Sequence, residues 1–140
     1  MNIVVSQIFG SMVSASKAAI AVALLFSGIG AAPAAAAGNP ALGKTVFAKC
    51  MVCHSIEPGK NKIGPSLAGV VGRTSGTVAG FNYSPAMKSS NIVWSSANLD
   101  TYLTNPRAMI PGNKMIFAGL PNPADRANII AYLLKPDVVK

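Results

Sequence analysis

Residues 50–54 read Cys50-Met51-Val52-Cys53-His54, a C-x-x-C-H pattern. Two thiols three positions apart on a helical turn lie on one face, so both can bond to the two vinyl groups of one porphyrin. The histidine that follows can reach the iron as an axial ligand. The pattern is the attachment signature of a c-type haem. The chain contains two cysteines and one histidine in all, so this chemistry depends on Cys50, Cys53 and His54.

A redox-active thiol pair, a zinc site and a plain disulfide all fit the sequence less well. A thioredoxin-like redox pair needs a βαβ setting, and no alternating strand pattern precedes Cys50. A structural zinc site draws on about four protein ligands, whereas this chain offers three. A simple disulfide gives no role to His54. The sequence therefore favours haem attachment over a zinc site or a thiol oxidoreductase.

The N-terminal region resembles an export signal. Residues 18–30 are apolar, Lys17 stands before them, and a stretch of small residues ends at Ala37. This order of charge, apolar core and A-x-A-like end is typical of a secretory signal peptide. We expect residues 1–37 to be a signal peptide cleaved near Ala37, and residues 38–140 to be the mature domain in a bacterial periplasm.

An uncleaved membrane anchor is the alternative, because residues 18–37 are about long enough to span a bilayer. Pro33 and two glycines dilute this segment, which favours cleavage. A mitochondrial presequence would be rich in arginine, yet the first arginine is Arg73. The stretch before the apolar core is long for a signal peptide, so Met12 is an alternative start of translation.

The mature chain is strongly basic. The whole chain has 12 Lys and Arg against four Asp and Glu, a formal net charge of +8 at pH 7. Lys17 is the one basic residue before Gly38, so cleavage removes a single positive charge. Such a balance indicates an acidic partner, an anionic membrane or nucleic acid. The basic residues form no dense run, which speaks against nucleic acid.

We expect an all-α domain of about four helices, joined by Gly- and Pro-rich loops. Each helix begins at a residue that commonly caps helices, and proline often follows it. The expected helices are 41–49 after Asn39-Pro40, 85–90 after Ser84-Pro85, a segment around 99–103 capped by Ser96 and stopped by Pro106, and one from Asn122-Pro123 to Pro136. So little regular structure implies a thin core, which a buried haem would complete.

Several further motifs follow one another along residues 38–140. They are Gly43–Phe47, Gly64–Leu67, Gly72-Arg73, Gly80–Tyr83, Trp94, Tyr102-Leu103, Asn105–Gly119 and Ile129–Leu133. With these motifs the chain resembles class I cytochrome c, in the group of bacterial cytochromes c2 and c550 close to the mitochondrial protein. The resemblance implies a fold wrapped round one covalently bound haem c, with the first and last helices crossing near Gly43 and Tyr132.

The resemblance also implies the axial ligands of the iron, His54 and Met115. Met51 lies within the haem motif and cannot reach the opposite face, and Met87 and Met109 are expected to fill the core. A thioether ligand favours Fe(II) and raises the reduction potential. With both axial positions filled, we expect electron transfer and no enzyme activity. An open-haem peroxidase or gas-binding protein is the alternative, and it would lack a strong sixth ligand.

Other residues of the haem pocket follow from the same resemblance. It assigns Arg73, Tyr83 and Trp94 to the haem propionates, because buried carboxylates need hydrogen-bond donors. It places Tyr102 near the iron ligand Met115, Phe117 at the haem edge, and the Pro65 carbonyl against the second ring nitrogen of His54.

Two positions depart from the mitochondrial pattern, and both concern the surroundings of Met115. Asn113 stands where threonine is usual, and Met87 stands where an asparagine often helps to hold an internal water. The polar network beside Met115 is therefore expected to differ from the mitochondrial one.

Basic residues are expected around the exposed haem edge, although scattered charges for solubility are the simpler interpretation. The expected docking residues are Lys49, Lys62, Lys88, Arg107 and Lys114. The partners would be acidic faces of a cytochrome bc1-type quinol–cytochrome c reductase and of a cytochrome c oxidase or photosynthetic reaction centre. The protein itself is expected to be a monomeric electron carrier.

Overall fold

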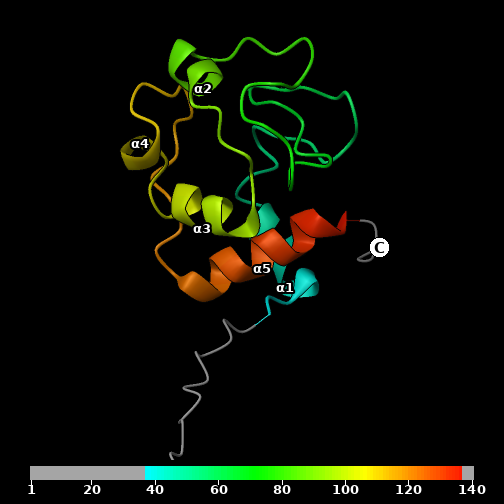
Figure 1. Cartoon of the computed structure of the whole chain (residues 1–140). Coiled ribbons are helices and arrows are strands. Elements are labelled where there is room, and N and C mark those ends of the chain that lie inside the picture. The colour runs from blue at the N-terminus through cyan, green and yellow to red at the C-terminus, as the bar shows by residue number, and fades with distance from the viewer. Residues whose placement is uncertain (1–36, 137–140) are drawn as a thin grey trace, which may run out of the picture. The chain divides into compact units, whose positions relative to one another are not determined.

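The computed structural model describes residues 37–136, so the expected signal peptide lies outside the described residues except for Ala37. Five helices occur in this range, and irregular loops connect them (Figure 1). They are α1 (Pro40–Phe47), α2 (Pro85–Ser89), α3 (Ser96–Thr104), α4 (Pro106–Met109) and α5 (Pro123–Leu134). Between residues 37 and 136 there is one isolated antiparallel bridge, Thr74 with Val93, and no strand. The all-α fold class is confirmed.

None of the five helices is long and apolar enough to cross a membrane.

Helices α1, α2 and α5 begin at the predicted residues. The side-chain oxygens of Asn39, Ser84 and Asn122 accept hydrogen bonds from backbone N–H groups in the first turn of each helix. These caps satisfy N–H groups that a helix leaves without an internal partner. A proline at the first helical position fits for the same reason, since proline has no N–H to leave unpaired.

The expectations for residues 95–109 are wrong in two respects. Ser95, and not Ser96, caps α3, because the Ser95 hydroxyl accepts from the N–H of Asn98 and Ser96 already belongs to the helix. Pro106 was expected to stop a helix, and it also starts one. The Asn105 side chain accepts from the N–H of Ala108 at 3.1 Å and so caps α4. The structure therefore has five helices within the described residues, where about four were expected.

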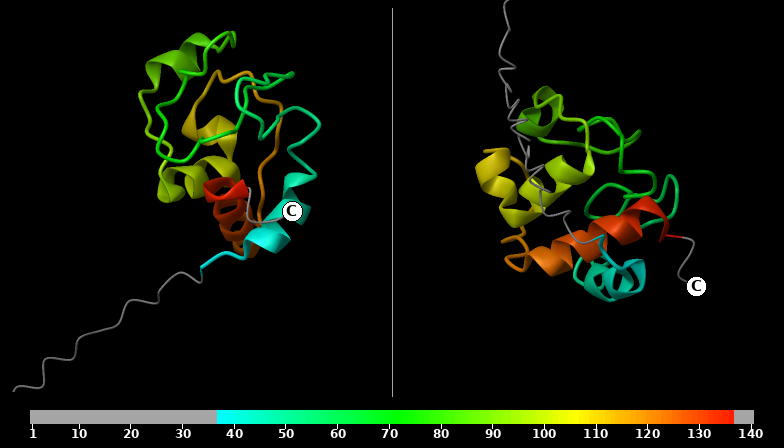
Figure 2. Two further views of the ribbon diagram at one scale, coloured as in Figure 1. Left: turned by 90° about the vertical axis from the view of Figure 1, so that its right-hand side faces the viewer. Right: turned by 60° about the horizontal axis from the view of Figure 1, so that its bottom comes forward.

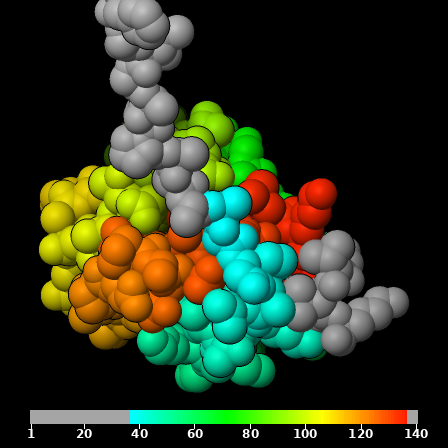
Figure 3. Space-filling view, turned by 90° about the horizontal axis from the view of Figure 1, so that it is seen from below, coloured from blue at the N-terminus to red at the C-terminus, as the bar shows by residue number. Residues whose placement is uncertain are grey.

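Helix α1 packs against α5, and the two lie side by side in Figures 2 and 3. Gly43 makes this close approach feasible, because a Cβ at this position would overlap the carbonyl oxygen of Asn128 and lie 2.7 Å from Cβ of Tyr132. The Phe47 and Tyr132 rings pack with their centroids 5.5 Å apart. The crossing expected near Gly43 and Tyr132 is present.

Helix α3 packs against α5 and α4, and so connects the helical pair to the rest of the domain. Ile129 of α5 is completely buried in this core. Arg126 of α5 donates to the Asp100 carboxylate of α3 at 2.7 Å and to the Leu120 carbonyl at 2.8 Å. The loop that leads into α5 is thereby tied to both helices.

Candidate functional site

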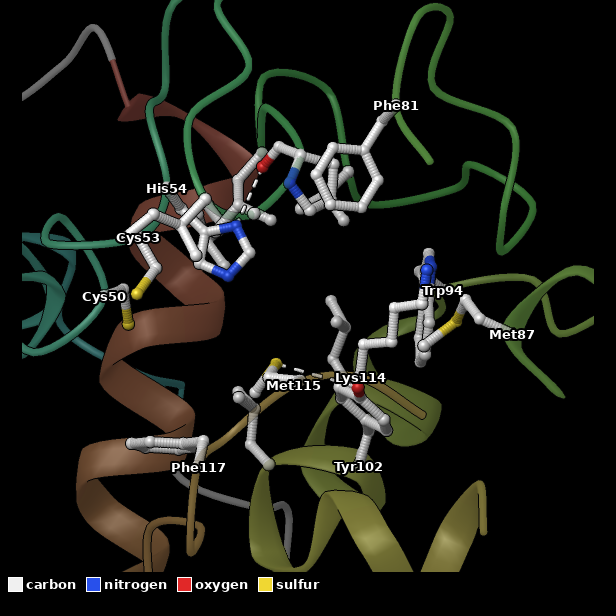
Figure 4. A pocket seen from close by; sticks show the side chains of 18 of the residues that line it. Cys50, Cys53, His54, Phe81, Met87, Trp94, Tyr102, Lys114, Met115 and Phe117 are labelled. Carbon is white, nitrogen blue, oxygen red and sulfur yellow. Dashed lines mark hydrogen bonds between the residues drawn. The ribbon is translucent and has the colours of Figure 1, made fainter. Parts of the chain in front are cut away.

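A cavity of about 470 Å³ opens in the middle of the described residues (Figure 4). Its lining is mostly apolar and comes from the turn after α1, from α2, α3 and α5, and from the loops between them. Among the lining side chains are Cys50, Cys53, His54, Arg73, Tyr83, Met87, Trp94, Tyr102, Lys114, Met115 and Phe117. Residues far apart in the sequence thus face one common space.

The turn after α1 carries the C-x-x-C-H motif into the wall of this cavity. The N–H of Cys50 donates to the Phe47 carbonyl at 2.7 Å, and the N–H of His54 donates to the Cys50 carbonyl at 2.9 Å. Both cysteines are free thiols, and Figure 4 shows them side by side at one edge of the cavity. Burial raises the pKa of the Cys50 thiol to about 11.

The His54 ring has a defined tautomer. Its Nδ1 lies 2.8 Å from the Pro65 carbonyl oxygen, which can only accept, so Nδ1 carries the proton. Nε2 then keeps its lone pair for a metal. Burial lowers the pKa of this imidazole, which favours the neutral ring that a metal requires.

Gly64 also contacts the His54 ring. A Cβ on Gly64 would overlap Cε1 of the ring and lie 2.7 Å from Nδ1 and 2.8 Å from Nε2. The Gly64 N–H donates to the Cys53 carbonyl at 2.8 Å, which keeps the glycine against the ring. The sequence signal was the Gly-Pro pair that supplies the acceptor carbonyl, yet no separate role for the glycine was predicted.

Met115 faces the cavity from the side opposite His54 (Figure 4). The Tyr102 hydroxyl donates to its sulfur at 3.7 Å, and the Asn113 side chain accepts from its backbone N–H at 2.9 Å. Burial raises the pKa of Tyr102 to about 12, so the hydroxyl keeps its proton at neutral pH. Tyr102 therefore lies beside Met115, where the resemblance placed it.

The other three methionines of the mature chain lie elsewhere. Met51 is exposed and Met109 is half-buried, and neither lines the cavity. Met87 is buried and lines the cavity from α2. Figure 4 shows its sulfur next to Trp94 and away from the space between His54 and Met115.

The three residues assigned to the propionates all line the cavity. Arg73 donates from Nη1 to the Ala68 carbonyl at 2.8 Å and from Nη2 to the Ser66 carbonyl at 3.0 Å. The Trp94 ring is buried and packs on Tyr102 with centroids 4.9 Å apart. Tyr83 packs edge-on against Phe81, a lining residue that sequence reasoning did not single out.

The five basic residues expected around the haem edge differ in their contacts. Lys49 and Lys114 line the cavity, whereas Lys62, Lys88 and Arg107 do not. Lys49 forms an ion pair with Asp125 of α5, and the Lys62 ammonium donates to the Met51 carbonyl. The Lys114 ammonium lies 3.4 Å from a neutral acceptor, the Asn82 carbonyl.

Two exposed apolar residues at this cavity were not predicted. Ile63 is 77% exposed and Ile116 is 91% exposed, and both line the cavity. Isolated exposed apolar side chains are common, but two at the mouth of one apolar cavity form a partly apolar rim. Their only sequence signal is position, since Ile63 precedes Gly64 and Ile116 follows Met115.

The residues present fit a c-type haem. Two thiols at one edge can form thioethers, an imidazole presents its free Nε2, a thioether faces it, and the walls are apolar. Within residues 37–136, no group of three His, Cys, Asp or Glu side chains is arranged to hold a metal ion directly. The fold and this donor set define a small all-α protein with a covalently attached haem.

Comparison with known proteins leads to the same class. The family described as cytochrome c matches residues 40–136. The cytochrome c2 of Rhodomicrobium vannielii is 52% identical over 103 residues, which cover 73% of this chain and 82% of that protein. The cytochrome c2 of Rhodoblastus acidophilus is 53% identical over 98 residues, which cover 69% of this chain and 92% of that protein.

A solved structure agrees with these relatives. Cytochrome cH from Methylobacterium extorquens superposes with a TM-score of 0.66 at 41% identity, covering 69% of this chain and 98% of that one. The chain belongs to the cytochrome c family, in the bacterial c2 group. It accordingly carries one covalently attached haem c and is an electron-transfer protein, not an enzyme.

Proposed function

We propose that the protein is a soluble, monomeric electron carrier in which His54 and Met115 are the axial ligands of the haem iron. The observation that carries this proposal is the placement of the His54 ring and the Met115 sulfur on opposite sides of one apolar cavity. Cys50 and Cys53 would supply the thioether bonds. When bound, the haem supplies the Fe(II)/Fe(III) couple.

The surrounding side chains support this assignment. The Pro65 carbonyl holds the imidazole in the tautomer that leaves Nε2 free. The Tyr102 hydroxyl donates to the Met115 sulfur. This hydrogen bond withdraws electron density from the thioether and favours the reduced metal. With both axial positions filled, the chain offers no open coordination site for oxygen or peroxide. We also assign Arg73, Tyr83 and Trp94 to the haem propionates.

The axial ligand is tested by removing each candidate thioether from the holoprotein. The oxidised wild-type protein should show the weak near-red sulfur-to-iron charge-transfer band. Met115→Ala should abolish the band, lower the reduction potential and let added imidazole bind, whereas Met109→Ala should do none of these. Loss of the band in Met109→Ala alone would overturn the assignment. A wild-type protein without the band would favour the open-haem alternative.

We further propose that acidic redox proteins dock at the cavity mouth near Lys114. The supporting features are the positive charge of Lys114 and the exposed side chain of Ile116. Lys49 is less available, because Asp125 already pairs with it. Lys88 of α2 and Arg107 of α4 would add further positive charge, and Arg107 lines a second pocket together with Ile116. The partners would be a cytochrome bc1-type reductase and a cytochrome c oxidase or photosynthetic reaction centre.

We propose that residues 1–37 are removed as a signal peptide and that the mature protein works in the periplasm. The support is the order of Lys17, the apolar run and the small residues before Gly38, which is typical of a signal peptide. Mass spectrometry of the protein from its native host would report both the haem adduct and the N-terminus. A membrane-bound product that retains residues 18–37 would replace this proposal with the tethered carrier.

A further inference from the structure

The side chain of Asn113 connects α4 to the loop that carries Met115. Its Nδ2 donates to the carbonyls of Pro106 and Ile110, each at 2.8 Å. Its Oδ1 accepts from the backbone N–H of Met115 at 2.9 Å. Both amide protons and the amide oxygen are thus used, and all three partners are backbone groups. Asn113 is half-buried, so these hydrogen bonds are partly shielded from water.

Backbone hydrogen bonds hold the two ends of this loop, from the Asn113 N–H to the Ile110 carbonyl and from the Leu120 N–H to the Leu103 carbonyl. Residues 110–120 contain no helix or strand in the structure. The Met115 N–H is paired with the Asn113 side chain in place of a backbone carbonyl. The Met115 sulfur receives a weak hydrogen bond from Tyr102 at 3.7 Å. Between the two ends of the loop, the Asn113 side chain connects the backbone of Met115 to α4, in addition to the packing of Met115 against the core.

Threonine, which is usual here in the mitochondrial pattern, could not reproduce this arrangement. A hydroxyl has one proton, so it cannot donate to both the Pro106 and Ile110 carbonyls while it accepts from Met115. Asparagine has two donors and an acceptor in a planar group, which matches two carbonyls and one N–H. The departure seen in the sequence thus corresponds to a different set of contacts.

We propose that Asn113 is a positioning residue that holds Met115 in the cavity and limits how readily its sulfur leaves the iron. This inference rests on the proposed axial ligation by Met115. Each of the three hydrogen bonds of Asn113 favours the position of the loop in which Met115 faces the cavity. Losing them should raise the population of the Met-dissociated form by about tenfold or more.

The test is imidazole binding to the ferric holoprotein, followed by loss of the near-red band. Imidazole binds the iron only where Met115 has dissociated, so its affinity reports that population. Asn113→Ala should raise the affinity about tenfold or more and speed hydrogen exchange of the Met115 amide. Asn113→Thr keeps an acceptor and one donor, so its affinity should fall between wild type and alanine. Asn113→Asp replaces the donor by an oxygen facing two carbonyls, so its affinity should be at least that of alanine.

A matched control separates this role from general stability. Asn122→Ala removes the cap of α5, whose side-chain oxygen accepts from the Ala124 N–H within the first turn of that helix and not from the loop of Met115. It should lower the denaturation midpoint and leave imidazole affinity unchanged. Equal imidazole affinity in wild type and Asn113→Ala would overturn the proposal. If Asn113→Ala yields no holoprotein, hydrogen exchange of the wild-type protein tests the proposal instead. A Met115 amide that exchanges at the unprotected rate would overturn the proposal.

Failure of the ligand assignment would look different. In that case wild type itself would lack the near-red band and bind imidazole tightly. A wild type that keeps the band, with Asn113 variants indistinguishable from it, would reject the role of Asn113 alone.

Discussion

Lys49 and Asp125 form an ion pair with 3.7 Å between Nζ and Oδ2. The pair joins the residue before Cys50 to the first turn of α5. It also offsets the charge of one of the two lysines that line the cavity, while the other, Lys114, contacts a neutral carbonyl. The positive charge at the cavity mouth is therefore concentrated on the side of Lys114.

Releasing Lys49 should speed association with an acidic partner. In Asp125→Asn no carboxylate offsets the positive charge of Lys49. Charge at the rim of an interface changes association rates more than final affinity. We expect about a twofold faster bimolecular rate at low salt, with a stability loss of about 0.5–1 kcal/mol from the exposed pair and the helix dipole. Stopped-flow kinetics against a purified reductase would measure the rate.

The matched control for this variant is Glu57→Gln. Glu57 pairs with Lys60, and neither residue lines the cavity, yet the change in net charge is the same. Equal acceleration by both variants would mean that net charge matters and the position of Lys49 does not.

Reversing the charge of Lys114 should slow docking. Lys114→Glu places a carboxylate at the cavity mouth, and the rate with an acidic partner should fall severalfold at low salt. The dependence on salt should flatten, since the Debye length shrinks from about 30 Å at 0.01 M to about 10 Å at 0.1 M. Lys135→Glu, at the end of α5, alters net charge equally and should slow the reaction much less. A comparable effect of both substitutions would contradict a localised docking surface.

The helix crossing should not tolerate a side chain at Gly43. In Gly43→Ala the new methyl group overlaps the Asn128 carbonyl, so α1 and α5 must move apart. We expect a loss of about 3 kcal/mol in the free energy of unfolding, measured by guanidinium denaturation of the holoprotein. The charge-transfer band should stay in place, because Gly43 does not line the cavity. A stability close to wild type would show that the helices adjust freely.

Gly64→Ala should instead affect the haem. Its methyl group meets the His54 ring beside Nδ1 and Nε2, so the ring must rotate or lose the Pro65 hydrogen bond. Electron paramagnetic resonance of the ferric protein and its reduction potential should both shift, with a stability loss of about 1–3 kcal/mol. Gly59→Ala, in the same loop at a φ of 71° with nothing near its Cβ, supplies backbone strain without the ring contact. Identical spectra in the two variants would exclude this role of Gly64.

Local chemistry in the sequence predicted much of the fold. The starts of α1, α2 and α5 follow from a capping side chain and the proline after it, which act within one turn. The start of α4 was missed although Asn105-Pro106 carries the same signal. A proline can end one helix and begin the next. The prediction treated Pro106 as the end of a helix and did not consider that it also begins one. Ser95 and Ser96 are both good caps, so the pattern could not distinguish them.

The contacts around Met115 could not be predicted in the same way. Asn113 reaches back to a carbonyl seven residues earlier, and Lys49 pairs with a carboxylate on another helix. Both contacts depend on how the chain returns on itself, which hydrophobic periodicity does not encode. The cavity likewise arises from widely separated segments, although the residues that the resemblance assigned to the haem pocket do line it.

The hydrogen bond from the Asn39 N–H to the Asn128 side chain joins residues 89 positions apart. Closing a loop of that length costs roughly 4 kcal/mol of chain entropy before any constant term. The packing of α1 on α5 offsets that cost, through the close approach of Gly43 to Asn128 and the contact of the Phe47 and Tyr132 rings. The two ends of the domain therefore hold each other in place, and local opening of α1 should release α5 with it as one cooperative unit.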